Sequence, residues 1–323
     1  MSTLRQFDAL ERVELPAGPV HLAIGMFDGV HRGHQTVISR AIAAAHQRGG
    51  VAGVLTFWPH PAVVLRPGQP VPLILTREAK RELLARLGID FLIEHAFTPE
   101  FAGTSARDFV RQLHAALPGL ERVYVGENFR FGRAREGDIA VLKEAAAENG
   151  FVVESVPRLS GEGAFISSSR VRELITAGEI AQANALLGYT FHTTGVVEAG
   201  RQLGRTLGFP TLNLGWAGDL EPRHGVYAVR VGEDAATAVP AVANFGLRPT
   251  VESGVTRPRL EVHVLGDTAL RYGDRARVWW LQFIRPERKF AGVEQLREQV
   301  EIDRRSAAAL LAKISAEEFP KSA

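Results

Sequence analysis

The chain has 323 residues, of which 46% are hydrophobic and 23% charged, and its formal net charge is +2. This composition suits a globular protein of two domains, and so small a net charge argues against nucleic acid or a membrane surface as partners. The chain has no cysteine, and no apolar run is long enough for a signal peptide or a bilayer span. We therefore expect a cytoplasmic protein without disulfides or thiolate metal sites.

The first part of the chain, up to residue 187, alternates apolar runs with amphipathic helical patterns. Either Thr104 or Ser105 is placed to cap one of these helices. The alternation predicts an α/β domain over residues 1–187, built on a doubly wound parallel sheet whose ligands bind beyond the carboxyl ends of the strands. We predict strands at 20–24, 51–57, 91–94, 123–125 and 152–156, and helices at 35–48, 77–87, 106–117 and 138–148.

The segment from Gly25 to His34, which joins the first strand to the first helix, reads Gly-Met-Phe-Asp-Gly-Val-His-Arg-Gly-His. Its glycines allow tight bends, and the N–H groups and dipole of the following helix favour bound phosphate. His31 and His34 are three residues apart, so both imidazoles point the same way on a helical turn. Phosphate binding is favoured over a metal pair, because we find no third ligand at a convincing spacing. Two surface histidines without a task are the plain alternative.

Three further segments at strand ends are expected to line the same crevice. Thr56–Pro61 is stiffened by two prolines and offers the flat face of Trp58, either as a substrate wall or as a structural loop. Val125–Gly132 contains Asn128, which can donate and accept hydrogen bonds, and two phenylalanines that we assign to packing. Phe165–Arg172 has three serines followed by two arginines, more than a helix cap needs and suited to phosphate oxygens.

After residue 187 the pattern changes to short β-type runs separated by glycine and proline. We interpret Gly188 to Thr194 as a linker, and we predict a second domain over residues 188–323. Closely spaced strands of this kind are typical of an antiparallel barrel or sandwich. Strands are expected at 193–197, 226–231, 239–244, 260–265 and 277–283, with a final amphipathic helix at 293–313.

The second domain has its own candidate phosphate site in the segment from Gly200 to Asn213. Gly204 and Gly208 permit close approach of the backbone to phosphates. Thr211 and Asn213 alternate onto one side of an extended chain, where two neutral oxygens could serve Mg²⁺ together with nucleotide phosphates. A glycine-rich hairpin is the structural alternative.

Charged side chains on two later strands are the remaining candidates. Glu261 shares a strand face with His263; such a carboxylate is usually solvated, but beside a metal-bound triphosphate it becomes a general base for an alcohol. Arg285 and Glu287 follow another strand, where they could bind a polar ring edge or form surface ion pairs.

Taken together, these segments resemble the bacterial family of bifunctional riboflavin kinases/FAD synthetases, over roughly residues 20–307. Nine segments in the family's order carry the resemblance: 25–34, 56–61, 125–132, 166–172, 204–213, 225–229, 244–250, 261–263 and 284–290. The resemblance implies an adenylyltransferase domain followed by a riboflavin kinase β-barrel with a C-terminal helix. Its substrates and products would be riboflavin, ATP, FMN and FAD, and its cofactor Mg²⁺.

The resemblance also implies roles for individual residues. His31 and His34, assisted by Asn128, would stabilise charge at the α-phosphorus of ATP, while Arg172 and two serines hold the departing pyrophosphate. Glu261 would activate the 5′-hydroxyl of riboflavin. The further nucleotide contacts would be Gly25, Phe27, Asp28, Gly33, Ser168, Ser169, Gly204, Gly208, Phe209 and Pro210; the flavin contacts Pro59, His60, Pro61, Arg285 and Glu287; and the metal ligands Thr211 and Asn213.

Two rival interpretations stay open at this point. The first is a single-activity nucleotidylyltransferase acting on another phosphorylated metabolite, with a β-domain that binds flavin without catalysis. The second is a nucleotide- or flavin-sensing regulator that keeps both folds without turnover. The intact Gly204–Asn213 segment and Glu261 speak against the first, and retention of His31 and Arg172 speaks against the second.

Overall fold

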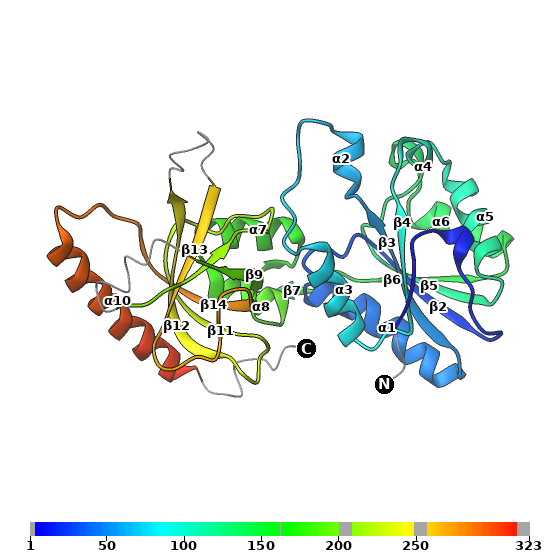
Figure 1. Cartoon of the computed structure of the whole chain (residues 1–323). Helices are drawn as coiled ribbons and strands as arrows, with labels where there is room; N and C mark the ends of the chain where they lie inside the picture. The colour runs from blue at the N-terminus through cyan, green and yellow to red at the C-terminus, as the bar shows by residue number, and fades with distance from the viewer. Residues whose placement is uncertain (1–3, 162, 200–208, 249–256, 315–323) are drawn as a thin grey trace. The chain divides into compact units, whose positions relative to one another are not determined.

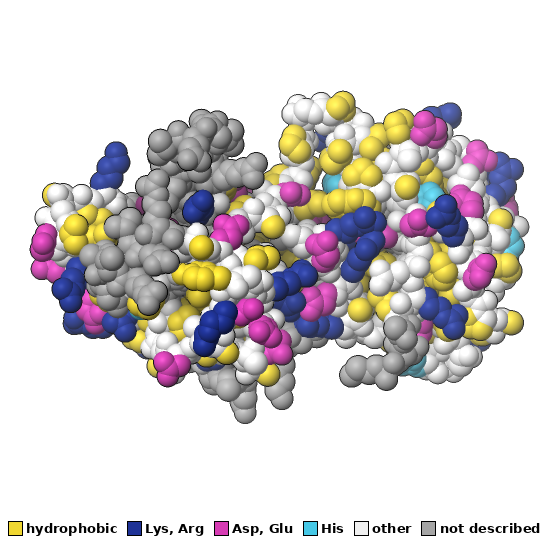
Figure 2. Space-filling view, viewed as in Figure 1, with side chains coloured by type: hydrophobic (Ala, Val, Ile, Leu, Met, Phe, Trp, Pro, Cys, Tyr) yellow, Lys and Arg dark blue, Asp and Glu magenta, His cyan; other side chains and the backbone are white. Residues whose placement is uncertain are grey.

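The computed structural model describes residues 4–161, 163–199, 209–248 and 257–314. By their internal contacts they form two compact units. The N-terminal unit comprises Met1–Pro72 and Arg77–Ser167, and the barrel unit comprises Leu73–Thr76 and Ser168–Ala323. Charged side chains of both signs are interspersed over the face seen in Figure 2.

The N-terminal unit is built on a six-stranded parallel sheet in the order β1-β4-β3-β2-β5-β6 (Figure 1). The strands that follow β2, namely β3 and β4, lie on one side of it, whereas β5 and β6 lie on its other side. The strand order therefore reverses between β2 and β5, and the carboxyl ends of these two strands form the topological switch point. The predicted parallel sheet is confirmed. The elements are β1 Arg5–Phe7, η1 Leu10–Arg12, β2 Val20–Ile24, α1 Arg32–Arg48, β3 Val51–Trp58, α2 Pro61–Leu65, α3 Arg77–Arg86, β4 Phe91–Ala96, α4 Pro99–Ala102, α5 Ala106–Ala116, β5 Leu120–Gly126, η2 Arg133–Arg135, α6 Ile139–Glu148, β6 Val152–Val156, and the hairpin β7 Ser160–Gly161 with β8 Ala164–Phe165.

Helices cover both faces of this sheet. All five residues of β2 are buried, so its side chains fill the core on both sides. Leu22 and Ile24 share a hydrophobic cluster with residues of α5 and α6. On the other face, α1 contacts β2, β3 and β5 through the stripe that includes Ile38 and Ala41. Of the two possible caps for α5, Ser105 is the one used, because its side chain accepts from the N–H of Asp108.

The barrel unit contains a closed, wholly antiparallel barrel in the order β10-β13-β12-β11-β14-β9. Its interior is filled by aromatic rings such as Trp280, Tyr227 and Phe245, each 0% exposed, so it is a packed core and not a pore. A predicted antiparallel barrel with a C-terminal helix is confirmed. The elements are α7 Ser168–Ala177, α8 Ile180–Leu187, β9 His192–Glu198, β10 Leu212–Gly215, β11 Gly225–Gly232, β12 Val239–Arg248, β13 Arg257–Val264, β14 Arg275–Pro286 and α10 Val293–Lys313.

Helix α10 packs on the outside of the barrel, where Figure 1 shows it lying along the strands in orange and red. Its Ala307 and Leu311 join a hydrophobic cluster with Val226 and Trp279 of the barrel strands. The predicted bounds of this helix are confirmed, and its buried side carries Gln299 and Asp303 in the first half and Ala307 and Leu311 in the second. No helix among the described residues is both long enough and apolar enough to cross a bilayer.

Two local predictions were wrong. The stretch from Gly188 to Thr194 is not a free linker: Phe191 is 1% exposed, its N–H donates to Asn184 Oδ1 at 2.7 Å, and β9 begins at His192. Buried aromatic residues inside a short glycine-flanked segment make it part of the core. The three serines do not all precede a helix, because Ser168 and Ser169 already form the first turn of α7.

Candidate active sites

The predicted phosphate segment forms a tight loop between β2 and α1, at the switch point of the sheet. Phe27 and Val30 have positive φ angles of 50° and 37°, an unusual backbone for residues with side chains. The ring of Phe27 is 1% exposed and lies so close to Gly25 that a Cβ there would be 2.9 Å from it. Asp28, at 5% exposure, is also buried in this loop. Such strain is held in place by the surrounding core and is common at ligand-binding loops.

His31 and His34 stack on each other at the start of α1, with ring centroids 3.6 Å apart and planes inclined by 16°. His31 is the N-cap of the helix, and its Nδ1 accepts from the N–H of His34 at 3.3 Å. Because Nδ1 is the acceptor, we assign the proton of the neutral ring to Nε2, which can then donate to a ligand. Gly33 allows this stacking, since a Cβ there would be 3.3 Å from the ring of His31.

Both histidines are neutral near pH 7. Burial lowers the pKa of His31 to about 4. The pKa of His34 is also held well below its usual value, first by burial and then by the nearby His31 and Lys80. These imidazoles can therefore donate hydrogen bonds, but they add no positive charge to the loop.

The predicted flavin wall lies at the carboxyl end of β3, next to the phosphate loop. The Trp58–Pro59 bond is cis, and His60 caps the short helix α2, which begins at Pro61. The guanidinium of Arg77 lies 5.3 Å from the ring centre of Trp58, a cation–π distance. The indole face that the sequence offered to a substrate thus has a cationic neighbour from α3.

At the end of β5, Asn128 is exposed in the turn that follows Gly126. The assignment of the two neighbouring phenylalanines to packing is confirmed: Phe129 and Phe131 stack with centroids 5.6 Å apart, and both contact the core. Because β3, β2 and β5 are adjacent, the loops carrying His60, His31 and Asn128 all follow neighbouring strand ends. The N-terminal unit therefore brings these predicted segments to one edge of its sheet.

Helix α7 carries the predicted pyrophosphate ligands Ser168, Ser169 and Arg172. Val171 and Ile175 are buried on its inner side, and α7 packs against α8. By its contacts it belongs to the barrel unit, whose main segment begins at Ser168. The contact boundary thus precedes residue 187, the predicted end of the first domain, by the length of two helices.

The barrel aligns three polar residues in one row: the predicted site residues Asn213 and Glu261, and Asn244, for which no role was predicted. In its register Glu261 of β13 lies directly opposite Asn213 of β10 and Asn244 of β12. Opposed residues share a face of the sheet, with Cβ atoms about 5 Å apart. Val226, opposite Asn244 on β11, packs with residues of α10, so the row lies on the outer face of the barrel that α10 partly covers. Asn244 belongs to the segment 244–250, one of the nine that carry the family resemblance, but no role had been predicted for it.

His263, two residues beyond Glu261, is tied to the segment that precedes β10. Its Nδ1 donates to the carbonyl oxygen of Pro210 at 2.8 Å, and its ring meets that of Phe209 edge-on at 5.6 Å. The guanidinium of Arg304 on α10 lies 5.6 Å from the ring centre of Phe209. These contacts hold the chain leading to the half-buried Thr211 against β13. The predicted phosphate residues Gly204 and Gly208 lie outside the described residues.

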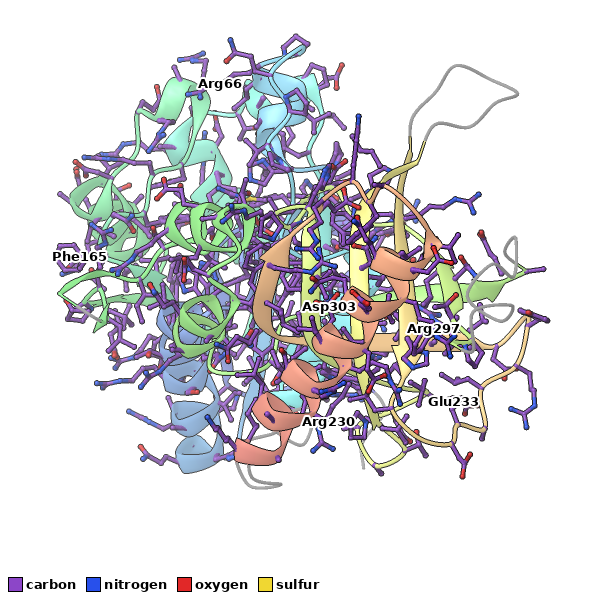
Figure 3. All side chains as sticks on the ribbon, turned by 90° about the vertical axis from the view of Figure 1, so that its left-hand side faces the viewer. Arg66, Phe165, Arg230, Glu233, Arg297 and Asp303 are labelled. Carbon is purple, nitrogen blue, oxygen red and sulfur yellow. The ribbon has the colours of Figure 1, made fainter. Side chains whose placement is uncertain are left out.

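Arg285 and Asp303 form a bidentate ion pair between the end of β14 and helix α10. Arg285 Nε and Nη2 donate to the two carboxylate oxygens of Asp303 at 2.8 and 2.6 Å. Gln299 donates to the same carboxylate at 2.7 Å. Asp303, labelled in Figure 3, lies on α10 and is only 4% exposed. The predicted flavin contact Arg285 thus holds α10 to the barrel here.

Glu287, the other predicted flavin contact on this strand end, lies over β12. It accepts a hydrogen bond from Asn244 at 3.2 Å. The carboxylate occupies the space above Gly246, where a Cβ would overlap its oxygen. Glu287 is therefore linked through Asn244 to the row that contains Glu261.

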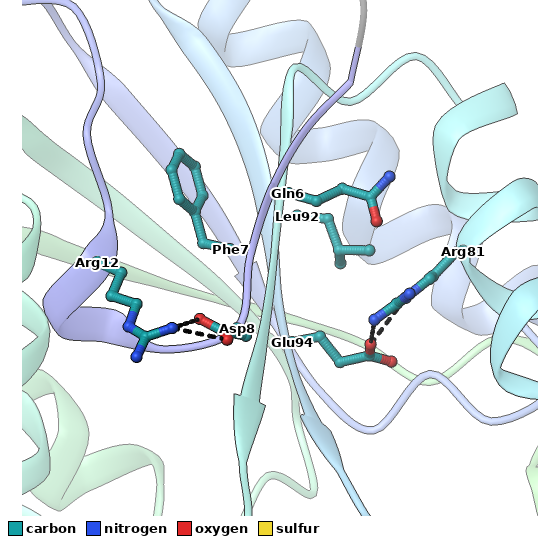
Figure 4. A pocket seen from close by; sticks show the side chains of 7 residues that line it. All are labelled: Gln6, Phe7, Asp8, Arg12, Arg81, Leu92 and Glu94. Carbon is teal, nitrogen blue, oxygen red and sulfur yellow. Dashed lines mark hydrogen bonds and ion pairs between the residues drawn. The ribbon is translucent and has the colours of Figure 1, made fainter.

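A further cavity of about 380 Å³ opens beside β1 and β4, and none of the residues that line it is a predicted site residue (Figure 4). Arg81 and Glu94 bridge one side of it, and Arg12 pairs with Asp8 on the other. Among the described residues, no three His, Cys, Asp or Glu side chains are grouped so as to hold a metal ion.

Lys80 of α3, which is 7% exposed in the N-terminal unit, was not among the predicted site residues. A signal for it existed. Lys80 is three and four residues before the buried Leu83 and Leu84, so it occupies the apolar stripe of its helix. A lysine in that stripe is rarely buried without a partner or a function.

Comparisons with known proteins address both units. A family described as FAD synthetase matches residues 16–170, and one described as riboflavin kinase matches residues 187–311. A bifunctional riboflavin kinase/FMN adenylyltransferase of Listeria monocytogenes is 39% identical over 295 residues, covering 91% of this chain and 93% of the relative. The protein of the same name from Escherichia coli K12 is 37% identical over 283 residues, covering 87% and 90%. A crystal structure titled macrolide-efflux protein, from Streptococcus pneumoniae, matches with a TM-score of 0.85 at 30% identity, covering 94% of this chain and 98% of the other.

Proposed function

Because the chain belongs to the family of bifunctional riboflavin kinases/FMN adenylyltransferases, we propose that it phosphorylates riboflavin with ATP to FMN and then adenylylates FMN with ATP to FAD and pyrophosphate. The observation that supports this most is the presence of two separate, differently built polar sites: the strained His31–His34 loop and the Asn213–Glu261–Asn244 row. Both substrates of the first step would be met in the cytoplasm, where we place the protein.

In the adenylyl transfer, a phosphate oxygen of FMN forms a bond to the α-phosphorus of ATP, and the bond from that phosphorus to the β-bridging oxygen breaks. We assign to His31 and His34 the hydrogen bonds that stabilise the negative charge during this exchange, with Asn128 assisting. The neutral His31 ring is suited to this because its Nδ1 is occupied by the backbone and leaves Nε2 as the donor. Gly25, Phe27, Asp28 and Gly33 shape the loop around the nucleotide, and Pro59, His60 and Pro61 form the wall for the flavin.

Ser168, Ser169 and Arg172 complete this assignment as ligands of the pyrophosphate that leaves. They lie on consecutive turns of α7, where hydroxyl and guanidinium donors suit phosphate oxygens. We keep the N-terminal domain at residues 1–187 in this proposal, although the contacts of α7 and α8 are with the barrel unit.

In the kinase step, the 5′-hydroxyl of riboflavin attacks the γ-phosphorus of ATP, and ADP leaves. Glu261 takes the hydroxyl proton, because it is the carboxylate of the polar row on the outer face of the barrel. Gly204, Gly208, Phe209 and Pro210 are the proposed nucleotide contacts, and Arg285 and Glu287 the flavin contacts.

We assign Thr211 and Asn213 as the residues that would hold Mg²⁺ with the nucleotide. Their neutral oxygen atoms are suitable ligands for a hard cation, and Asn213 is directly opposite Glu261. When bound, the ion neutralises charge on the triphosphate. The remaining work of binding and orienting the substrates belongs to the side chains named above.

The two sites can be separated by mutation. Purified wild-type protein, Glu261→Ala and His31→Ala are incubated with ATP, Mg²⁺ and either riboflavin or FMN, and the flavins are separated by chromatography. We expect Glu261→Ala to form FAD from supplied FMN but no FMN from riboflavin, and His31→Ala to accumulate FMN. If either folded variant loses both activities, the two-site assignment is wrong. If the wild-type protein forms no FMN from riboflavin but adenylylates another phosphorylated metabolite, the result would favour the alternative of a single-activity nucleotidylyltransferase.

A further inference from the structure

In the adenylyl-transfer site proposed above, the one cationic side chain named so far is Arg172, which we assign to the leaving pyrophosphate. The phosphate of FMN therefore has no cation among the named residues. Two phosphate groups, one from FMN and one from ATP, must approach each other there, yet His31 and His34 are neutral near pH 7. Hydrogen bonds from neutral rings stabilise anions less than charged donors do. A cation at the strand ends is therefore expected, and α3 supplies one.

Lys80 reaches the phosphate loop through a single bridging residue. Its ammonium donates to Thr56 Oγ1 at 3.3 Å, and the Thr56 hydroxyl donates in turn to the carbonyl oxygen of Met26 at 3.1 Å. Met26 lies between Gly25 and Phe27 in the loop itself. Thr56, at 0% exposure, ends the buried part of β3, two residues before Trp58. Lys80 thus lies where the phosphate loop and the predicted flavin wall meet.

The hydrogen bonds of Lys80 are incomplete. An ammonium group has three donors. Within the part of the chain that the structure describes, Thr56 is its one hydrogen-bond partner, and Glu94 Oε1 stands at 3.9 Å, an ion-pair distance. The side chain is nevertheless only 9% exposed, so water does not readily replace the missing partners. A buried ammonium with unused donors is costly unless an anion binds to it.

Glu94 has two counter-ions besides Lys80, both of them on its other carboxylate oxygen. Its Oε2 already accepts from Arg77 Nε at 2.7 Å and from Arg81 Nε at 2.8 Å. Counting Asp28, which also attracts the Lys80 charge, three described cations face two carboxylates in this cluster. Placing a third cation beside two arginines is unfavourable in itself, and a phosphate would balance it.

We propose that Lys80 binds the phosphate of FMN and is a catalytic residue of adenylyl transfer, an inference that rests on the proposed function. Its ammonium donates to the non-bridging oxygens of that phosphate while another oxygen of the group forms the bond to the α-phosphorus and pyrophosphate leaves. Thr56 and Glu94 fix the position of the ammonium, and the lysine keeps its proton throughout. The charge that Lys80 supplies lies on the FMN side of the reaction, whereas the two histidines face the ATP side.

The test measures FAD formation from supplied FMN in the variants Lys80→Met and Arg81→Met. Arg81→Met is a matched control, because Arg81 is on the same helix and is also an ion-pair partner of Glu94. We expect Lys80→Met to lower kcat/KM for FMN by about 100- to 1000-fold, as for loss of one preorganised donor to a transition state. Arg81→Met should change it little. FMN formation from riboflavin should be unchanged in both, because the kinase site is in the barrel unit.

A second variant excludes a merely structural role. Lys80→Met/Glu94→Gln removes both members of the Lys80–Glu94 pair, so any loss that comes only from breaking this pair is relieved. On our proposal this double variant stays as inactive in FAD formation as Lys80→Met. Recovery of near-wild-type FAD formation would show that Lys80 only neutralises Glu94, and a folded Lys80→Met with its full rate would also overturn the inference. Wild-type protein that forms no FAD would remove the proposed function along with it.

Discussion

The ion pair between Arg285 and Asp303 gives the sharpest stability prediction. The perturbation is Asp303→Ala, which removes the carboxylate that accepts from Arg285 Nε, Arg285 Nη2 and Gln299. The guanidinium then keeps one hydrogen bond, from Nη1 to the Pro286 carbonyl at 2.9 Å. The buried middle of α10 is left facing a cation without a counter-ion.

The magnitude follows from the burial of the two partners. Breaking a buried pair by removing one member costs about 3–5 kcal/mol. The side chain of Asp303 is 6% exposed, whereas that of Arg285 is 19% exposed and can be partly rehydrated. We therefore take the lower end, about 3 kcal/mol. For a domain of this size that corresponds to a fall of roughly 6–12 °C in the unfolding midpoint.

Differential scanning calorimetry measures the transition in which the barrel unit unfolds. Glu301→Ala is the matched control, because Glu301 lies on the same helix but pairs with Arg304 and Arg305 at the surface; its midpoint should be nearly that of the wild type. Arg285→Met/Asp303→Leu should recover most of the loss, since neither charge is then buried alone. A fall of less than about 2 °C for Asp303→Ala would refute the reasoning.

Two further predictions concern pH and the kinase site. The folded pKa of His31 is about 4 against 6.5 when unfolded, so its neutral form contributes stability in full above pH 6.5, and this is lost as the pH falls toward 4. Between pH 7 and pH 4.5 the free energy of unfolding of His31→Gln should accordingly drop by about 2–3 kcal/mol less than that of the wild type, and equal drops in calorimetry would contradict the assignment. Gly246→Ala should push Glu287 off Asn244 and lower kcat/KM for riboflavin about tenfold, with FAD formation from FMN unchanged. Steady-state kinetics with unaltered riboflavin phosphorylation would show that Glu287 has no part in the kinase site.

Much of the architecture could be predicted from the sequence, because the evidence for it is local. The five buried residues of β2 form a short, largely apolar run in the chain, and the amphipathic pattern of α10 is equally local. The predicted bounds of both elements agree with the structure. The strand-to-helix turn at Gly25–His34 could be placed for the same reason. Local pattern failed where tertiary contacts dominate, as in the segment around Phe191, whose turn-like residues belong to the core.

What the sequence by itself determined is thus the order and type of most of the elements, although β1 and β10 were not among the predicted strands, together with the two polar segments to which we assign the chemistry. Only the tertiary structure decided which side chains meet. Glu261 lies opposite Asn213 and Asn244 because the register of a closed barrel pairs residues far apart in the chain. Lys80 meets Thr56, 24 residues away, because α3 packs over the strand ends. Hydrophobic periodicity reports the face that a residue takes on its own element, whereas register and packing set its neighbour, and these depend on the whole fold.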